Sequence, residues 1–359
     1  MAHKFIISIL VLAFASSFAA AQSGRVKPSE SPTPSPERPR VIYQPTQPVT
    51  KKKDPDPEAT PPPLPKIEDD VLRVNSTLVP IPVSVTDPYG RAVTNLKLED
   101  FNLRIDGKAA EVSDLFTSDT PVRLALLFDN SSSVFQAREF EKKAAVRFFK
   151  RVLRPEKDLA ALYSVASGVR LEQTLTRNTS DLIRALDSLL EPKGATKLLD
   201  AIIEASNYLQ DYQGRRVIVI VSDGEDNLSD SSLAETVRAA QVNNCQIYVV
   251  KTTEFENYKR TGNRQGNANI RYLAAERRMQ ELGAQTGGAV YSPIDEDELD
   301  AAFARISAEL SQQYILSYYP QDDADRPGEF RQISLSVKGA SNLTVRTRKG
   351  YFVPKAVKQ

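Results

Sequence analysis

Five oxygen-bearing side chains occur in three separate segments of the chain, at spacings that suit a single metal site. Asp129, Ser131 and Ser133 lie in FDNSSS, Thr196 lies in KGATKLLDA, and Asp223 lies in VIVIVSDGED. All five are hard oxygen ligands, which suit Mg2+, Mn2+ or Ca2+ and not Zn2+ or Cu2+. Because only two of them are carboxylates, a bound divalent ion would keep positive charge and accept one more carboxylate from a partner. The set therefore predicts recognition and not catalysis.

The neighbouring sequence predicts that these segments meet. Asp129 ends the apolar run VRLALLFD and Asp223 ends RRVIVIVSD, both typical of buried parallel strands, and Thr196 opens the predicted helix LLDAIIEASNYLQ. Ligands of an open α/β sheet bind at the carboxyl ends of its strands. On its own, DNSSS would also suit a helix N-cap loop. The positions of Thr196 and Asp223 favour the metal site.

The order of the predicted elements indicates the fold class. Residues 121–311 alternate apolar strands with amphipathic helices, which predicts a doubly wound, mostly parallel α/β sheet. Residues 70–118 and 312–354 carry the alternating pattern of β-strands. We expect these two flanks to pair into one β-sandwich, with the α/β domain inserted between them.

These motifs carry a family resemblance. DxSxS after an apolar strand, GxT before a helix, and a strand ending in SDG resemble the von Willebrand factor type A domain, whose metal-ion-dependent adhesion site uses these five positions. Ser132 stands where Gly is commoner, and GAT replaces the commoner GGT, but neither change removes a ligand. The flanking motifs IPVSVTDPYGRAVTNLKLEDFNLRIDGK, SQQYILSYYP and RKGYF are similar to those of secreted bacterial proteins known as the VWFA-related acidobacterial family.

The resemblance implies a role for each ligand. Ser131 and Ser133 would bind the ion directly, Asp129 and Asp223 largely through water, and Thr196 in either way. An Asp or Glu of a protein partner would complete the coordination. Some members of the family couple this event to movement of the last helix, which here lies near residues 297–311.

The N-terminal segments predict export. Residues 1–21 combine a weakly basic start, an apolar run and an A-x-A site, as in a secretory signal cleaved after Ala21; an uncleaved anchor is the alternative. Residues 22–69 are rich in Pro and poor in large apolar residues, which predicts a disordered or polyproline-II linker. No later stretch reaches ~18 unbroken apolar residues, so we expect a secreted or periplasmic chain that is not inserted in the membrane.

Composition excludes several functions. The only His, His3, lies in the signal segment, so no His-dependent nucleophile or His-ligated metal site is possible after cleavage, and we predict that the protein is not an enzyme. The single Cys, Cys245, begins an apolar strand pattern and is expected to be buried. With 47 Lys and Arg against 46 Asp and Glu, charge gives no case for nucleic acid.

Four alternatives remain for the function. We expect an exported adhesion or protein-interaction module. The others are a cell-envelope scaffold or assembly factor using the same site, a metal-assisted hydrolase, and a structural module with a vestigial site.

One further segment carries a partner prediction. Residues 252–272 are long for a connection after a strand and are rich in Asn, Gly and Arg, so we expect a loop on the metal face. A rim of positive charge for an acidic partner would then come from Lys259, Arg260, Arg264 and Arg271. A mobile surface insertion is the alternative.

Overall fold

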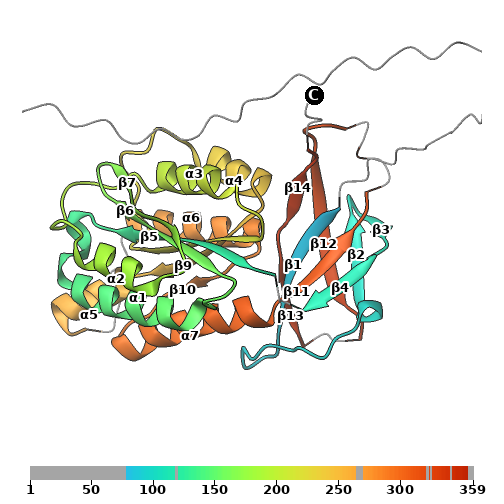
Figure 1. Ribbon diagram of the computed structural model, residues 1–359, viewed down its shortest axis with the longest axis horizontal. Coiled ribbons are helices and arrows are strands. Elements are labelled where there is room, and N and C mark those ends of the chain that lie inside the picture. The colour runs from blue at the N-terminus through green and yellow to red at the C-terminus, as the bar shows by residue number, and fades with distance from the viewer. Residues whose placement is uncertain are drawn as a thin grey trace, which may run out of the picture. The chain divides into compact units, whose positions relative to one another are not determined.

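The chain has an α/β region with strands of two further sheets before and after it in sequence (Figure 1). The computed structural model describes residues 78–117, 120–263, 270–320, 323, 326–339 and 342–354. The predicted signal segment 1–21, the predicted linker 22–69 and Arg264 lie outside the described residues. All of these described residues belong to one compact unit.

The α/β region is built on a six-stranded sheet with the order β10-β9-β8-β5-β6-β7. Its strands are β5 (Val122–Asp129), β6 (Leu159–Val165), β7 (Val169–Thr176), β8 (Arg215–Ser222), β9 (Cys245–Lys251) and β10 (Val290–Tyr291). Neighbouring strands are parallel except for β7, which pairs with β6 in the antiparallel sense at one edge. The predicted mostly parallel sheet is therefore confirmed.

Helices cover both faces of this sheet. They are η2 (Ser132–Gln136), α1 (Arg138–Val152), α2 (Thr179–Asp187), α3 (Leu198–Leu209), α4 (Leu233–Val242), α5 (Thr253–Thr261), α6 (Ile270–Thr286) and α7 (Glu296–Gln312). Buried residues of α1, α2 and α7 form a hydrophobic cluster on one face, and those of α3, α4 and α6 form a second cluster on the other. Among the described residues no helix is long and apolar enough to span a bilayer.

Strand β5 has an uninterrupted apolar sequence because both of its faces are buried. Leu124, Leu126 and Phe128 belong to the first cluster, whereas Ala125 and Leu127 belong to the second. Successive side chains of a strand point to opposite faces, so a strand with helices on both sides needs apolar residues at every position.

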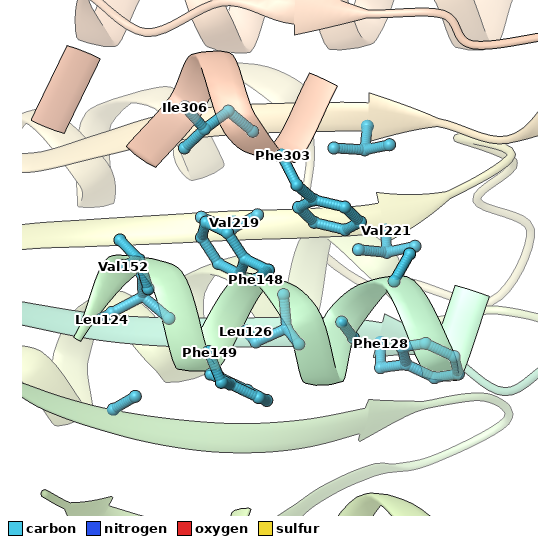
Figure 2. Close-up of a cluster of buried hydrophobic side chains, with 14 of the residues drawn as sticks. Leu124, Leu126, Phe128, Phe148, Phe149, Val152, Val219, Val221, Phe303 and Ile306 are labelled. Carbon is cyan, nitrogen blue, oxygen red and sulfur yellow. The ribbon is translucent and has the colours of Figure 1, made fainter. Parts of the chain in front are cut away.

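The first cluster joins α1 and α7 to the sheet (Figure 2). The rings of Phe148 on α1 and Phe303 on α7 have centroids 4.9 Å apart, and both residues are buried. Phe303 and Ile306 lie above Val219 and Val221 of β8 in the same view. This packing fixes the position of β5 and β8, whose carboxyl ends carry two of the predicted ligands.

The remaining strands form two four-stranded sheets, with orders β13-β1-β11-β4 and β14-β12-β2-β3. The elements are β1 (Val79–Thr86), η1 (Leu98–Asp100), β2 (Phe101–Ile105), β3 (Lys108–Ala110), β4 (Asp114–Thr117), β11 (Tyr314–Tyr318), β12 (Phe330–Val337), β13 (Thr344–Thr347) and β14 (Gly350–Phe352). Each sheet contains strands from before and after the α/β region, with β1 pairing with β11 and β2 with β12. Buried side chains of both sheets share one hydrophobic cluster.

Helix α7 leads directly into β11, and Glu309 near its end contacts several elements. Its Oε1 accepts hydrogen bonds from the hydroxyls of Ser84 on β1 (2.5 Å) and Tyr248 on β9 (2.8 Å). Its Oε2 forms a 2.5 Å ion pair with Arg346 on β13. One carboxylate therefore ties the end of α7 to the α/β sheet and to a flanking sheet.

Candidate metal centre

The predicted ligands lie at the carboxyl ends of neighbouring strands. Asp129 is the last residue of β5, and Asp223 follows the last residue of β8 directly. The two strands pair in parallel, with Phe128 opposite Val221. Asp129, Ser131, Thr196 and Asp223 are buried, with exposed fractions of 1–3%. Ser133 is exposed.

The loop after β5 brings hydroxyl groups together. The Oδ1 atom of Asp129 accepts a hydrogen bond from the N–H of Ser131 at 2.9 Å, and its Oδ2 accepts one from the Ser222 hydroxyl at 2.5 Å. The hydroxyl oxygens of Ser131 and Ser133 are 3.0 Å apart. Three of the predicted ligand side chains therefore belong to one short loop, whose aspartate is also bonded to the end of β8.

A second contact holds the Thr196 segment against this loop. The N–H of Ser132 donates to the Gly194 carbonyl (3.1 Å), and the N–H of Gly194 donates to the Ser132 hydroxyl (2.9 Å). The φ angle of Gly194 is 81°, a conformation that glycine adopts without strain. The serine that replaces the commoner glycine thus links two ligand segments, a role that its sequence position alone does not indicate.

Asn227 fixes the backbone of Thr196 from the third segment. Its Oδ1 accepts a hydrogen bond from the N–H of Thr196 at 2.8 Å, and its own N–H donates to the Thr196 carbonyl at 3.2 Å. Thr196 lies just before α3, with Lys197 at the N-cap position. Asn227 is a supporting residue that sequence reasoning missed; its place in SDGEDN, directly after a ligand strand, was the available signal.

Asp226 supports the same helix. Its Oδ1 accepts hydrogen bonds from the N–H of Leu198 (2.9 Å) and from the hydroxyl of Ser229 (2.6 Å). A carboxylate at a helix N-terminus satisfies a free N–H group and interacts favourably with the helix dipole. The segment after β8 therefore both carries Asp223 and caps α3.

Four acidic side chains influence one another at this edge of the sheet. Burial, and next the charge of Asp223, raise the pKa of Asp129 to about 7. Burial, and next the charge of Asp129, raise the pKa of Glu141 on α1 to about 8. The pKa of Glu256 on α5 is raised well above its ordinary value by burial and then by Glu141 and Asp223. These carboxyl groups are crowded in a place with little water, so without a counter-ion they keep their protons to a higher pH than exposed acids do.

The donor set fits a hard cation. Its side chains offer carboxylate and hydroxyl oxygens, the ligands of Mg2+ and Ca2+, and Mg2+ is commonly held by one or two carboxylates while keeping several waters. In the described residues no group of three or more His, Cys, Asp or Glu side chains is arranged to hold a metal. The candidate set depends instead on two aspartates and three hydroxyls.

The expectation that residues 252–272 form one long loop is wrong. Residues 253–261 form helix α5, and α6 begins at Ile270. Phe255 is buried and packs edge-on against Phe140 of α1, with ring centroids 6.3 Å apart. Gly262, with φ 69°, ends the helix. The polar composition suggested a loop, but this short helix buries Thr253, Phe255 and Asn257 against its neighbours.

The described residues of the predicted basic rim, Lys259, Arg260 and Arg271, are therefore spread over two helices. Lys259 pairs with Glu296 and lies 3.7 Å from the centroid of the Phe140 ring. Arg260 is exposed and donates a hydrogen bond to the Asn257 side chain at 2.7 Å. Arg271 is exposed in the first turn of α6.

Residues 124–225 match the family of the von Willebrand factor type A domain. The matched range spans the three segments that carry the predicted ligands. No curated protein gives a significant match.

Several solved structures resemble the chain. A variant of the PilB minor pilin from Streptococcus sanguinis is 13% identical with a TM-score of 0.42, and the match covers 57% of this chain and 64% of the pilin chain, less than two thirds. The conserved hypothetical protein BatB from Bacteroides thetaiotaomicron is 18% identical with a TM-score of 0.41, covering 52% and 97%. The vWF domain of the type V pili tip protein Mfa5 from Porphyromonas gingivalis is 13% identical with a TM-score of 0.41, covering 52% and 94%. At these values the likenesses say nothing about partners.

Proposed function

We propose that this protein, with its von Willebrand factor type A domain, is an exported module that binds other proteins in a divalent-cation-dependent way. The observation that carries the proposal is the hydrogen-bonded group formed by the Asp129–Ser133 loop, the Thr196 segment and the Asp223 segment. This group presents oxygen ligands, and a bound cation would offset the burial and mutual repulsion that raise the pKa of Asp129.

The ion in this proposal is Mg2+, with Mn2+ or Ca2+ as the other candidates. Asp129, Ser131, Ser133, Thr196 and Asp223 hold it, and when bound it supplies a Lewis-acidic centre that accepts an oxygen ligand. A partner protein offers an Asp or Glu carboxylate to that centre. Lys259, Arg260, Arg264 and Arg271 are proposed to add positive charge for the same partner.

Recognition is a better account than catalysis. After the proposed removal of residues 1–21 the chain contains no His, so the commonest general base is missing. A cell-envelope scaffold or assembly factor with the same ion site is the second candidate function, because it needs the same chemistry with a resident partner.

The remaining features of the proposal concern organisation. Residues 1–21 direct export to the periplasm or cell exterior, and residues 22–69 act as a linker. The two flanking sheets form a β-sandwich of the kind expected for the VWFA-related acidobacterial family. Support comes from the Pro-rich sequence and from the shared hydrophobic cluster of the two sheets.

The test is calorimetric titration of residues 22–359 with Mg2+, Mn2+ and Ca2+, beside Asp129→Ala. One binding site in the wild type that is lost in the variant supports the ion site. A pull-down from envelope extracts with Mg2+ or with EDTA then tests recognition. Partners retained equally in EDTA would refute cation dependence, and a wild type that binds no ion in titration would refute the site.

A further inference from the structure

Glu141 is a buried acidic residue on α1 that lies outside the five predicted ligand positions. Its exposed fraction is 1%, and its Oε1 atom has no hydrogen-bond partner. Its carboxylate does have a hydrogen bond with the hydroxyl of Thr252, which directly follows β9. A carboxylate with a free oxygen in a buried place is costly unless something compensates its charge.

The Thr252 hydroxyl cannot donate a hydrogen bond to both of its acidic neighbours at once. It also donates to Oε1 of Glu256 on α5, at 2.8 Å. A hydroxyl group carries a single proton, so it serves only one of the two carboxylates as donor. Glu141 and Glu256 therefore share one donor between them.

The charges that act on Glu141 are acidic. They come from Asp129 at the end of β5 and Asp223 after β8, and Glu256 adds a third through its own interaction with Glu141. Two basic side chains of these helices are engaged elsewhere. Arg138 of α1 donates a hydrogen bond to the Leu189 carbonyl, between α2 and α3, at 2.9 Å. Lys259 of α5 pairs with Glu296. The segment that bonds Glu141 is itself bonded to the end of β8: the N–H of Thr252 donates to the Ser222 carbonyl at 2.9 Å, and the Thr253 hydroxyl donates to the Asp223 carbonyl at 3.0 Å.

We infer that Glu141 is a sixth member of the cation site, whose free Oε1 accepts a hydrogen bond from water bound to the ion. This inference rests on the proposed function, because it assigns a further residue to the same ion. Groups that contact the ligands of a metal and not the metal itself orient those ligands and tune the affinity of the site. Glu141 also supplies negative charge within the protein, so the ion is held before a partner carboxylate arrives.

The test compares Glu141→Gln with Glu139→Gln in residues 22–359. Glu139 lies on the same helix with its side chain 69% exposed, so it receives the same chemical change at the surface. Mn2+ affinity is measured by calorimetry, and the melting temperature is measured in EDTA. Glu141→Gln should weaken Mn2+ binding roughly tenfold with one site retained, and should leave the melting temperature of the metal-free protein close to that of the wild type, because the neutral amide has nearly the shape of the protonated carboxyl. Glu139→Gln should match the wild type in both measurements.

Glu141→Asp keeps the charge and should retain more Mn2+ affinity than Glu141→Gln, which a purely structural role would not produce. Wild-type affinity in Glu141→Gln, with binding lost in Asp129→Ala, would overturn this inference and leave the proposed function intact. A wild type that binds no ion would overturn both, and that failure is visible before any Glu141 variant is measured.

Discussion

Asp129→Asn should remove a pH dependence of stability that the metal-free protein owes to a buried carboxylate. The pKa of Asp129 is raised from 3.8 to about 7, first by burial and then by the charge of Asp223. Because the folded pKa lies above the unfolded one, the linked stability is fully present below the unfolded pKa and is lost as pH rises through about 7. The metal-free wild type should therefore become less stable between pH 5 and pH 8.

The magnitude follows from the two pKa values. At pH 5 the unfolded carboxyl is already ionised, while the folded one stays protonated until about pH 7, so roughly two pKa units of free energy are lost in this interval. At about 1.4 kcal/mol for each unit, the loss is about 2–3 kcal/mol. For a chain of this size that corresponds to roughly 5–10 °C in melting temperature.

The assay is thermal and urea unfolding in EDTA at several pH values from 5 to 8, for the wild type and Asp129→Asn. The amide also alters the hydrogen bonds from Ser131 and Ser222, but that offset does not change with pH. The exposed Asp211→Asn variant makes the same substitution at the surface and should follow the wild type. Addition of Mn2+ at pH 8 should restore the wild type and leave Asp129→Asn unchanged. A wild-type minus variant difference that stays constant from pH 5 to 8 would refute the reasoning.

Three other outcomes are expected. Asn227→Ala removes the acceptor of the Thr196 N–H, which should cost about 1 kcal/mol of stability and weaken cation affinity; unchanged affinity in a calorimetric titration would contradict its role in holding this segment. Glu309→Gln removes the charge that pairs with Arg346, which should cost about 2–3 kcal/mol in urea unfolding; a cost near zero would show that this carboxylate does not stabilise the end of α7. Burial raises the pKa of Cys245 to about 12, so a thiol reagent at pH 8 should react with the denatured chain and not the native one, and rapid stoichiometric reaction of the native protein would contradict this burial.

Much of the α/β region was predictable from local sequence because its strands are buried on both faces. The uninterrupted apolar runs of β5 and β8, each followed by Asp, identified two strand ends and hence one edge of the sheet. The same patterns placed Thr196 before a helix. Strand β7 was not predicted, because its residues are half-buried or exposed and carry no apolar run; it pairs with β6 in an irregular antiparallel way.

The sequence by itself therefore determined most element types of the α/β region and the presence of oxygen-bearing side chains at two strand ends, because strand burial and helix periodicity are properties of neighbouring residues. Only the tertiary structure decided which polar groups surround those side chains. The hydrogen bonds of Ser132, Asn227 and Glu141 span separations in sequence that no local pattern records. It also decided that residues 253–261 are helical, because the docking of Phe255 on α1 is a long-range contact. The burial and the electrostatic environment of a side chain depend on which segments pack around it, and they are set only when the chain folds.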